Sequence, residues 1–271
     1  MNGADITEVE ARNALIDAVM AFGAHSNSLI LVGAQALYYR TSKIDLPVAP
    51  ATKDADFTID PRDLGADPLL QNMLEEAGFR RDPITSNPGA WVSGDNIPVD
   101  FMVPGLMAGS RSRSADLSPH ANFVGRKTEG LEASVFDFTC ETVSSLDASR
   151  PNVSLNIANE PALLIAKLVK VNERIGNPKR FKQKDCYDIY RLLLATLPEL
   201  IAPTLKRLKS EPLVANSVTV ALATLEMHFA DSEESIGSRS AGQAEFGIGD
   251  PDSVAARTMA MAKELLGLVG V

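Results

Sequence analysis

Hydrophobic and polar positions follow several distinct patterns in the first part of the chain. From residue 6 to residue 22 the apolar side chains recur mainly at helical spacing, with Asn13 as a polar interruption, and Gly23 can end the helix. The continuously apolar run "SLILVG", residues 28–33, predicts a central strand that ends at a glycine. Because "AQALYYR" then suits a helix, the pattern predicts a strand, a glycine corner and a helix in direct succession.

Strict alternation follows in "DADFTID", residues 54–60. Successive side chains of a strand point to opposite faces, so Phe57 and Ile59 are expected to face a core. Asp54 and Asp56 then share the other face, which we expect to open to a cleft or to solvent. Two like charges on one side of a strand repel each other unless a cation or a catalytic role compensates.

The other strands of the first half are predicted from the same kind of pattern. Residues 90–104, "AWVSGDNIPVDFMVP", are typical of a hairpin with its turn at "SGDN" and with Asp100 in the second strand. Two further short strands are expected at residues 134–143 and 152–158. No strand–helix unit repeats, which favours an α/β or α+β sheet over a barrel.

Helical spacing dominates the chain from Asn159 onward. A serine- and glycine-rich stretch, residues 231–253, is expected to be a mobile loop. We therefore predict a mixed sheet domain over residues 1–157 and a helical domain over residues 158–271 that completes a cleft. The helices of this second domain are expected at residues 159–175 and 179–197, within residues 203–229, and at residues 254–269.

Composition narrows the class of protein. With 271 residues, of which 45% are hydrophobic and 23% charged, the chain is long enough for one large or two modest domains with a packed core. The net charge of -9 argues against a protein that coats DNA, although it leaves room for a local basic groove. The two cysteines, Cys140 and Cys186, lack CxxC spacing, so neither a disulfide framework nor a zinc site is supported and a reducing, cytoplasmic setting is expected.

The chain also lacks the patterns of secretion and membrane insertion. Its N-terminus is polar and acidic and does not resemble a signal peptide. No uninterrupted apolar run approaches the roughly 20 residues that a membrane helix needs. We therefore expect a soluble protein with no membrane partner.

Gly33, Asp54, Asp56 and Asp100 form the strongest candidate site. Carboxylates at i and i+2 of a strand can share a divalent ion, and a third on a neighbouring strand would complete an oxygen-rich site for one or two magnesium ions. The strand–glycine–helix corner offers backbone N–H groups and a helix N-terminus to phosphate, so the set outlines a nucleotide site. The alternative is that Asp54 and Asp56 are solvated strand residues and that Asp100 is an edge charge.

These motifs resemble the nucleotidyltransferase superfamily that shares its fold with DNA polymerase beta. The pattern of that family is a hydrophobic strand, a Gly-Ser or Gly-Gly corner, a DxD strand and a third acid on a later strand, matched here by "LVGA", "DAD" and "VDF". The wording of "TKDADF" and "KDCYDIYRLL" is similar to the AbiE-type toxin nucleotidyltransferases of bacterial toxin–antitoxin systems. The resemblance covers residues 29–194. The corner departs from the pattern at Ala34 and Gln35, where a small hydroxyl or a second glycine is common.

The resemblance implies a magnesium-dependent enzyme that moves a nucleoside monophosphate from an NTP to an acceptor and releases pyrophosphate. Asp54 and Asp56 would bind magnesium, and Asp100 would ligate a second ion or activate the acceptor hydroxyl. The amides of Gly33 and Ala34 would hold phosphate. The resemblance further implies a toxin whose acceptor is tRNA or a protein and which a cognate antitoxin controls.

A second candidate set consists of Lys167, Lys184, Asp185 and Asp188. Residues 161–191 contain eight Lys or Arg and three acids, so this part of an acidic chain is locally basic. From the residues alone we favour a solvated helix pair with ordinary salt bridges. The family pattern, a Lys followed by Lys/Arg-Asp-x-x-Asp, implies instead that Lys167 neutralises triphosphate charge, that Asp185 and Asp188 orient it, and that Lys184 aids nucleotide binding.

Other charged and titratable residues give weaker indications. The three histidines lack metal-ligand spacing and are expected to be structural or surface residues: His25, His120 and His228. Four cations fall in a loop expected at residues 105–130: Arg111, Arg113, Arg126 and Lys127. They could contact a nucleic-acid backbone, but solvated loop charge is the interpretation that we favour.

Three rival functions remain open from the sequence. An antibiotic-modifying nucleotidyltransferase would use the same acids with a pocket for a small polyol or amine. A non-catalytic binding module would keep the fold without the metal. A metal-dependent phosphodiesterase is disfavoured, because three histidines are too few for the usual histidine–aspartate site.

Overall fold

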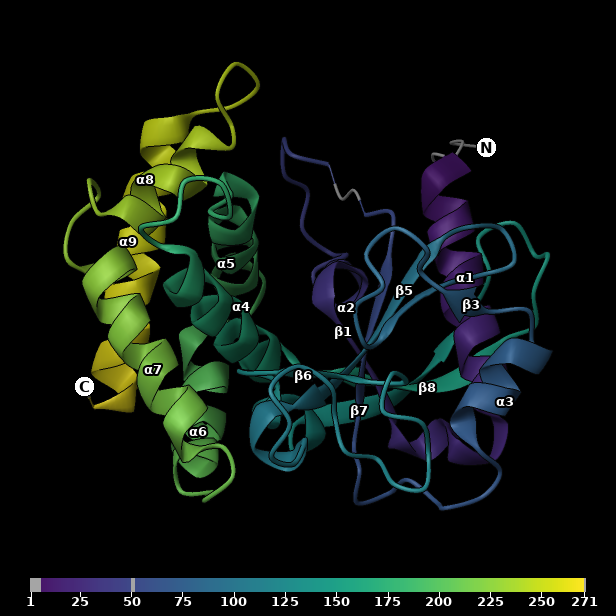
Figure 1. Cartoon of the computed structure of the whole chain (residues 1–271). Coiled ribbons are helices and arrows are strands. Elements are labelled where there is room, and N and C mark those ends of the chain that lie inside the picture. Colours follow the sequence, from purple (N-terminus) through teal and green to yellow (C-terminus); the bar gives the residue numbers. More distant parts are fainter. Residues whose placement is uncertain (1–5, 50–51, 271) are drawn as a thin grey trace. The chain divides into compact units, whose positions relative to one another are not determined.

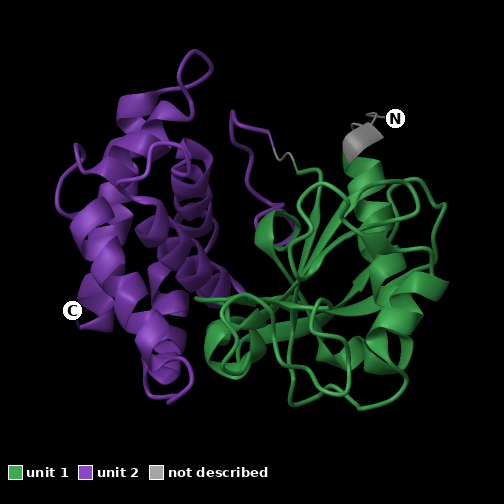
Figure 2. Ribbon diagram, viewed as in Figure 1, with its two compact units in different colours: residues 1–36, 51–158 green, residues 37–50, 159–271 purple. Residues whose placement is uncertain are grey.

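The chain forms two compact units, which Figure 2 shows in different colours. The computed structural model describes residues 6–49 and 52–270. Unit 1 consists of residues 1–36 and 51–158, and unit 2 of residues 37–50 and 159–271. Residues 37–50, which the sequence analysis assigns to the N-terminal domain, therefore group with the C-terminal helices.

The strands of unit 1 form a mixed sheet. They are β1 (Leu29–Val32), β2 (Ala55–Ile59), β3 (Arg80–Arg81), β4 (Ala90–Val92), β5 (Pro98–Pro104), β6 (Arg126–Thr128), β7 (Phe138–Val143) and β8 (Val153–Ala158). Within the described residues the strand order is β3-β4-β5-β2-β1-β8-β7, and β6 pairs with β5. β1 is antiparallel to β2 and parallel to β8, and β2 is parallel to β5. The mixed sheet and the helical second half of the chain confirm the expected fold class.

The burial of β1 and β2 follows from their position in the middle of the sheet. All four residues of β1 are buried, as its continuous apolar run predicts. Phe57 and Ile59 of β2 are buried as expected, but Thr58 and Asp60 on the other face are buried too. The Asp60 carboxylate accepts from Arg62 at 2.7 Å, and the same guanidinium donates to the carbonyl of Val135 at 3.0 Å. The expectation of an open polar face is therefore wrong at Thr58 and at Asp60, which directly follows β2.

One face of the sheet is covered by α1 (Ile6–Phe22), which also packs against α3 (Leu70–Glu76) (Figure 1). The ring of Phe22 lies 4.9 Å from that of Phe101 on β5, measured between centroids. Asn13, the polar interruption of the helical stripe, is buried and donates to Asp147 at 3.4 Å and to Ser149 at 3.0 Å. Its amide therefore fastens the loop before β8 to α1.

Unit 2 is built from packed helices (Figure 1). They are α4 (Glu160–Arg174), α5 (Gln183–Ala195), α6 (Pro198–Lys209), α7 (Ala215–Leu225), η4 (Glu226–Ala230), α8 (Ile236–Gln243) and α9 (Pro251–Val269). α4 contacts α5 and α7, and α8 contacts α5 and α9. Across the described ranges, no helix combines the length and apolar composition that crossing a bilayer requires.

Helix α8 corrects the expectation of a loop at residues 231–253, because residues 236–243 of that stretch are helical. Its small residues are packing positions. A Cβ atom on Gly237 would lie 2.5 Å from the carbonyl oxygen of His228, and one on Gly242 would overlap the carbonyl oxygen of Pro251. Ser238 is fully buried and donates to the carbonyl of Phe229 at 2.7 Å. Glycine and serine are needed here because the neighbouring backbone approaches so closely.

This close packing predicts opposite effects for two glycine substitutions. Gly242→Ala should lower the free energy of unfolding by about 1–3 kcal/mol, because the added methyl group overlaps the backbone at Pro251. Gly267→Ala, in α9, adds a methyl group with no atom within 4 Å and should raise it by about 0.5–1 kcal/mol through helix propensity. Urea unfolding followed by circular dichroism measures both. A stabilised Gly242→Ala protein would show that α8 is loosely packed.

Candidate functional site

Two of the three predicted carboxylates are direct neighbours in the sheet. Asp56 on β2 and Asp100 on β5 are register partners in parallel strands, so their side chains lie on the same face. The next residues in both strands, Phe57 and Phe101, point to the opposite face, where α1 packs. Asp54 comes just before β2 and is exposed. The third carboxylate expected on a neighbouring strand therefore lies beside Asp56 in unit 1, whereas Asp54 lies just outside β2.

The glycine corner lies directly against Asp56. Val32, the last residue of β1, is the register partner of Asp56, and helix α2 (Gly33–Arg40) begins at the next residue. Gly33 has φ of +67°, and a Cβ atom there would lie 2.6 Å from Cβ of Asp56 and would overlap its carboxylate. Only glycine fits this position, both for its backbone conformation and for the contact. The first turn of α2 thus starts beside the carboxylate, and its N–H groups are of the kind that bind phosphate.

Gln35 is a site residue that the sequence interpretation missed. Its side chain is buried, and its amide donates to the carbonyl of Ala11 at 3.0 Å and to the carbonyl of Asp54 at 2.9 Å. It therefore fixes the main chain before β2 relative to the glycine corner. A lone glutamine in the otherwise apolar first turn of a helix was the available signal. The departure from the family pattern at this dipeptide thus has a structural role.

Arg126 is a second residue of the site whose role the sequence interpretation did not predict. It belongs to strand β6 and not to a solvated loop, and its Nη2 donates to Oδ2 of Asp100 at 3.0 Å. Burial raises the pKa of Asp100 above its usual range, while the positive charge of Arg126 acts in the opposite direction and the nearby Asp54 adds to the rise. The guanidinium therefore partly offsets the cost of placing Asp100 among other carboxylates.

The residues present fit a magnesium ion that brings ligands of its own. Among the described residues, no three His, Cys, Asp or Glu side chains come close enough together to hold a metal ion by themselves. Magnesium, however, is usually bound by one or two carboxylates with water and substrate phosphate, rather than by a cage of protein ligands. The neighbouring carboxylates of Asp56 and Asp100 meet this requirement, and Asp54 lies two residues before Asp56, just outside β2.

The second candidate set is an ion-pair network between α4 and α5 in unit 2. Lys167 is buried and its Nζ donates to Asp188 at 2.6 Å and lies 3.5 Å from Asp185. Asp185 also pairs with Lys170 at 3.0 Å and with Arg174 at 2.8 Å. Burial opposes ionisation of Asp185, but Lys170 and Lys167 outweigh it and lower its pKa. The pairs that Lys167 makes are buried, unlike the solvated pairs favoured from the residues alone, while Lys170 is 39% exposed at the edge of the network.

Lys184 has a different contact. It is exposed, and its Nζ is 5.7 Å from the ring centroid of Tyr38. Arg191 contacts the same ring at 5.5 Å and donates to the carbonyl of Val48 at 2.6 Å. These contacts attach residues 37–50 to α5 and explain why that segment groups with the helices.

The histidines have structural surroundings. His25 and His120 are buried and meet edge to face with centroids 5.6 Å apart. Nδ1 of His120 accepts from the N–H of Leu70 at 3.1 Å, and its Nε2 lies 2.8 Å from the carbonyl oxygen of Gly65. Burial lowers the pKa of His120, so its neutral form is favoured. Both rings therefore hold the chain near α3, as expected for structural histidines.

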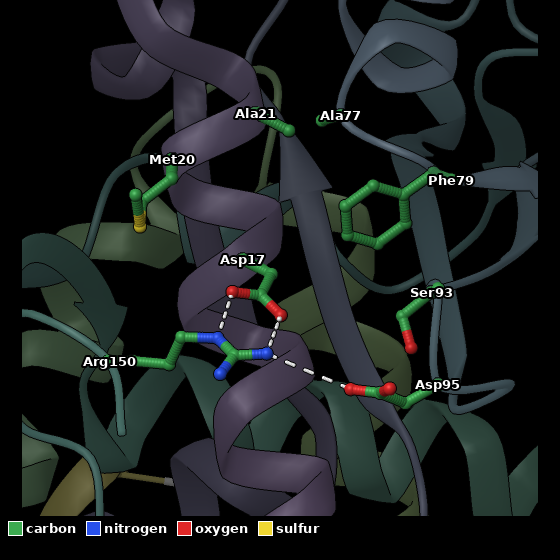
Figure 3. A pocket seen from close by; sticks show the side chains of 9 residues that line it. Asp17, Met20, Ala21, Ala77, Phe79, Ser93, Asp95 and Arg150 are labelled. Carbon is green, nitrogen blue, oxygen red and sulfur yellow. Dashed lines mark hydrogen bonds and ion pairs between the residues drawn. The ribbon is translucent and has the colours of Figure 1, made fainter. Parts of the chain in front are cut away.

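A cavity of about 470 Å³ lies beside α1, between residues of α1 and of the β4–β5 turn (Figure 3). Its wall includes Asp17 and Met20 of α1, the helix that packs on the phenylalanine face. Arg150 crosses it and pairs with Asp17 at 2.6 Å and with Asp95 at 3.7 Å (Figure 3). The candidate acids are not among its lining residues, so the cavity is separate from the acid site.

Comparison with known proteins gives limited information. No protein-family profile and no curated protein sequence matches the chain. Among the solved structures that resemble it is "Crystal structure of putative nucleotidyltransferase from H. pylori", with a TM-score of 0.42 and 13% sequence identity over 97% of this chain and 95% of that one. Because both values are low, the assignment of a function rests on the geometry of the site.

The contact between Gly33 and Asp56 can be tested against a glycine that shares only its backbone conformation. Gly33 and Gly78 both have positive φ, +67° and +85°, so an alanine costs about 1–2 kcal/mol at either. Gly78 has no neighbour within 4 Å, whereas Gly33 contacts Asp56. Gly33→Ala should therefore lower the free energy of unfolding by a further ~1–3 kcal/mol in urea titrations. Equal losses would show that Asp56 turns aside freely.

Proposed function

We propose that the chain is a magnesium-dependent nucleotidyltransferase that moves a nucleoside monophosphate from an NTP to an acceptor and releases pyrophosphate. The observation that carries the proposal is the in-register pair Asp56 and Asp100, placed against a glycine corner that opens a helix. Paired carboxylates suit magnesium, and the first N–H groups of α2 suit phosphate. Few other chemistries need both groups side by side.

Each residue of the site has a defined part in this reaction. Asp56 and Asp100 would hold magnesium, with Asp54 as a further carboxylate. Bound there, magnesium would neutralise triphosphate charge and stabilise the oxygens that attack and leave phosphorus. The amides of Gly33 and Ala34 would orient the phosphates. A carboxylate of this set would accept the proton of the acceptor hydroxyl, whose oxygen attacks the α-phosphorus while the bond to pyrophosphate breaks.

Lys167 would supply positive charge to the triphosphate, and Lys184 would add to nucleotide binding. Support comes from the network itself: three cations, Lys167, Lys170 and Arg174, meet the two carboxylates of Asp185 and Asp188. The five side chains leave one positive charge in excess. Asp188 would then orient the amino group of Lys167, which it binds at 2.6 Å.

The acceptor and the biological role are proposed from the resemblance to AbiE-type toxins. We infer that the acceptor is tRNA or a protein side chain, and that a cognate antitoxin restrains the enzyme in the cytoplasm. Within the locally basic stretch at residues 161–191, the exposed side chains of Lys179, Arg180 and Lys182 support an RNA acceptor, since phosphate contacts need Lys and Arg.

Label transfer tests the activity. The protein is incubated with magnesium, total cell RNA and each α-labelled NTP in turn, and label should move to RNA or to protein. Asp56→Asn should reduce transfer about a hundredfold or more, because a carboxylate in contact with the reacting complex is lost. Asp95→Asn removes the same charge from a largely exposed side chain on the cavity wall and should leave transfer unchanged.

The outcomes separate the rival functions. Label on an aminoglycoside but not on RNA or protein would identify an antibiotic-modifying transferase. Magnesium-dependent NTP binding without transfer to any acceptor would favour a binding module. If Asp56→Asn binds and transfers as the unchanged protein does, the acid pair is not the site.

Growth tests the proposed toxic role. Induction of the chain in a bacterial host should arrest growth, because modified tRNA or protein is withdrawn from translation. Asp56→Asn should abolish the arrest, and co-expression of the neighbouring open reading frame should relieve it. Optical density and colony counts measure both effects. Normal growth with an active enzyme would contradict the proposed toxic role without contradicting the proposed transferase activity.

A further inference from the structure

We propose that Arg126 is a phosphate-binding residue of the acid site, held in readiness by Asp100 and turned in part to the triphosphate when a metal–nucleotide complex binds. The inference rests on the proposed function. Nη2 of Arg126 donates to Oδ2 of Asp100 at 3.0 Å, and the two side chains are 32% and 31% exposed. The guanidinium thus lies at the edge of the site and still reaches solvent.

The position of Arg126 is built into the sheet. β6 runs parallel to β5, with Arg126 paired to Met102, so its side chain reaches back two residues to Asp100. The approach of this strand depends on Gly89, which has φ of +75° and where a Cβ atom would lie 2.6 Å from the backbone nitrogen of Arg126. A bridge to Ser114 holds the other side of the strand.

The chemistry of the guanidinium matches a phosphate. It carries five N–H donors, and within the described residues one of its nitrogens, Nη2, donates to Asp100, which leaves the other donors for a ligand. Its planar fork binds phosphate oxygens in pairs. The carboxylates of Asp54, Asp56 and Asp100 repel a triphosphate, so positive charge beside them favours its approach.

Two opposite consequences follow from this arrangement. Arg126 occupies an oxygen of Asp100 and places a positive charge beside it, so it should weaken metal binding when no nucleotide is present. It should strengthen nucleotide binding once the metal is bound, by a charge-assisted hydrogen bond to phosphate. A purely structural arginine would not produce effects of opposite sign.

The experiment measures both affinities on the full chain at about pH 8, where carboxyls are ionised. Manganese serves as the metal probe, and its free signal is followed by electron paramagnetic resonance. The α,β-methylene analogues of the four NTPs serve as nucleotide probes with manganese in excess. Arg126→Gln should tighten manganese binding about threefold to tenfold and weaken nucleotide binding about tenfold, the usual size for a lost charged hydrogen bond.

Two further variants control the measurement. Arg126→Lys keeps the charge without the fork and should shift nucleotide affinity by a smaller factor in the same direction. Arg81→Gln removes a matched charge from β3, where the guanidinium stacks on Phe123 at 4.7 Å, and should change neither affinity. Circular dichroism checks that each variant is folded.

The failures of the two proposals are distinguishable. If the unchanged protein binds no manganese, or if Asp56→Asn leaves the manganese affinity unchanged, the metal site and the proposed function are overturned. If manganese binding depends on Asp56 but Arg126→Gln weakens both affinities or alters neither, the role of Arg126 is overturned and the proposed function stands.

Discussion

The register between β2 and β5 is the constraint on which the rest of unit 1 depends. Because side chains alternate with a period of two, one pairing places Asp56 beside Asp100 and, on the other face, Phe57 beside Phe101. If one of the two strands slipped by one residue, its carboxylate would turn toward the core and its phenylalanine would turn toward the charged site. The core under α1 and the charged site are therefore set by the same hydrogen bonds, and neither can shift without the other.

The like charges that this register brings together are accommodated by two local devices. The glycine corner admits the Asp56 carboxylate against bare backbone, and Arg126 provides a positive charge for Asp100. Gln35 holds the entry to β2 from the other side through the carbonyl of Asp54. Unit 2 balances its buried charges in a different way, with Lys167 and Asp188 joined directly within a larger network of α4 and α5. Burial without such partners would cost several kcal/mol per charge.

The sequence predicted what depends on local periodicity. The strands that carry Asp56 and Asp100 could be expected, because alternation and a hairpin signal are local patterns. Their pairing joins segments distant in sequence, and only the family resemblance implied it. The roles of Gln35 and Arg126 could not be predicted from the sequence. Gln35 contacts the carbonyl of Asp54, which is distant in sequence, and Arg126 reaches Asp100 from β6, a strand that was not predicted. The burial of Asp60 was not predicted for a related reason, since Arg62, which pairs with Asp60, is itself bound to the carbonyl of Val135, far along the chain.

Helix α8 reverses the usual link between composition and tolerance to change. Its glycines and serines resemble a linker, and a protein engineer would choose this stretch for a peptide tag or a fluorescent insert. Yet Gly237 and Gly242 touch the backbone of their neighbours, so the residues that look most dispensable are among the most tightly fixed. The place with room is a few residues later at Gly247, which has positive φ and no neighbour within 4 Å. An insertion site in this unit is better chosen by contact than by composition.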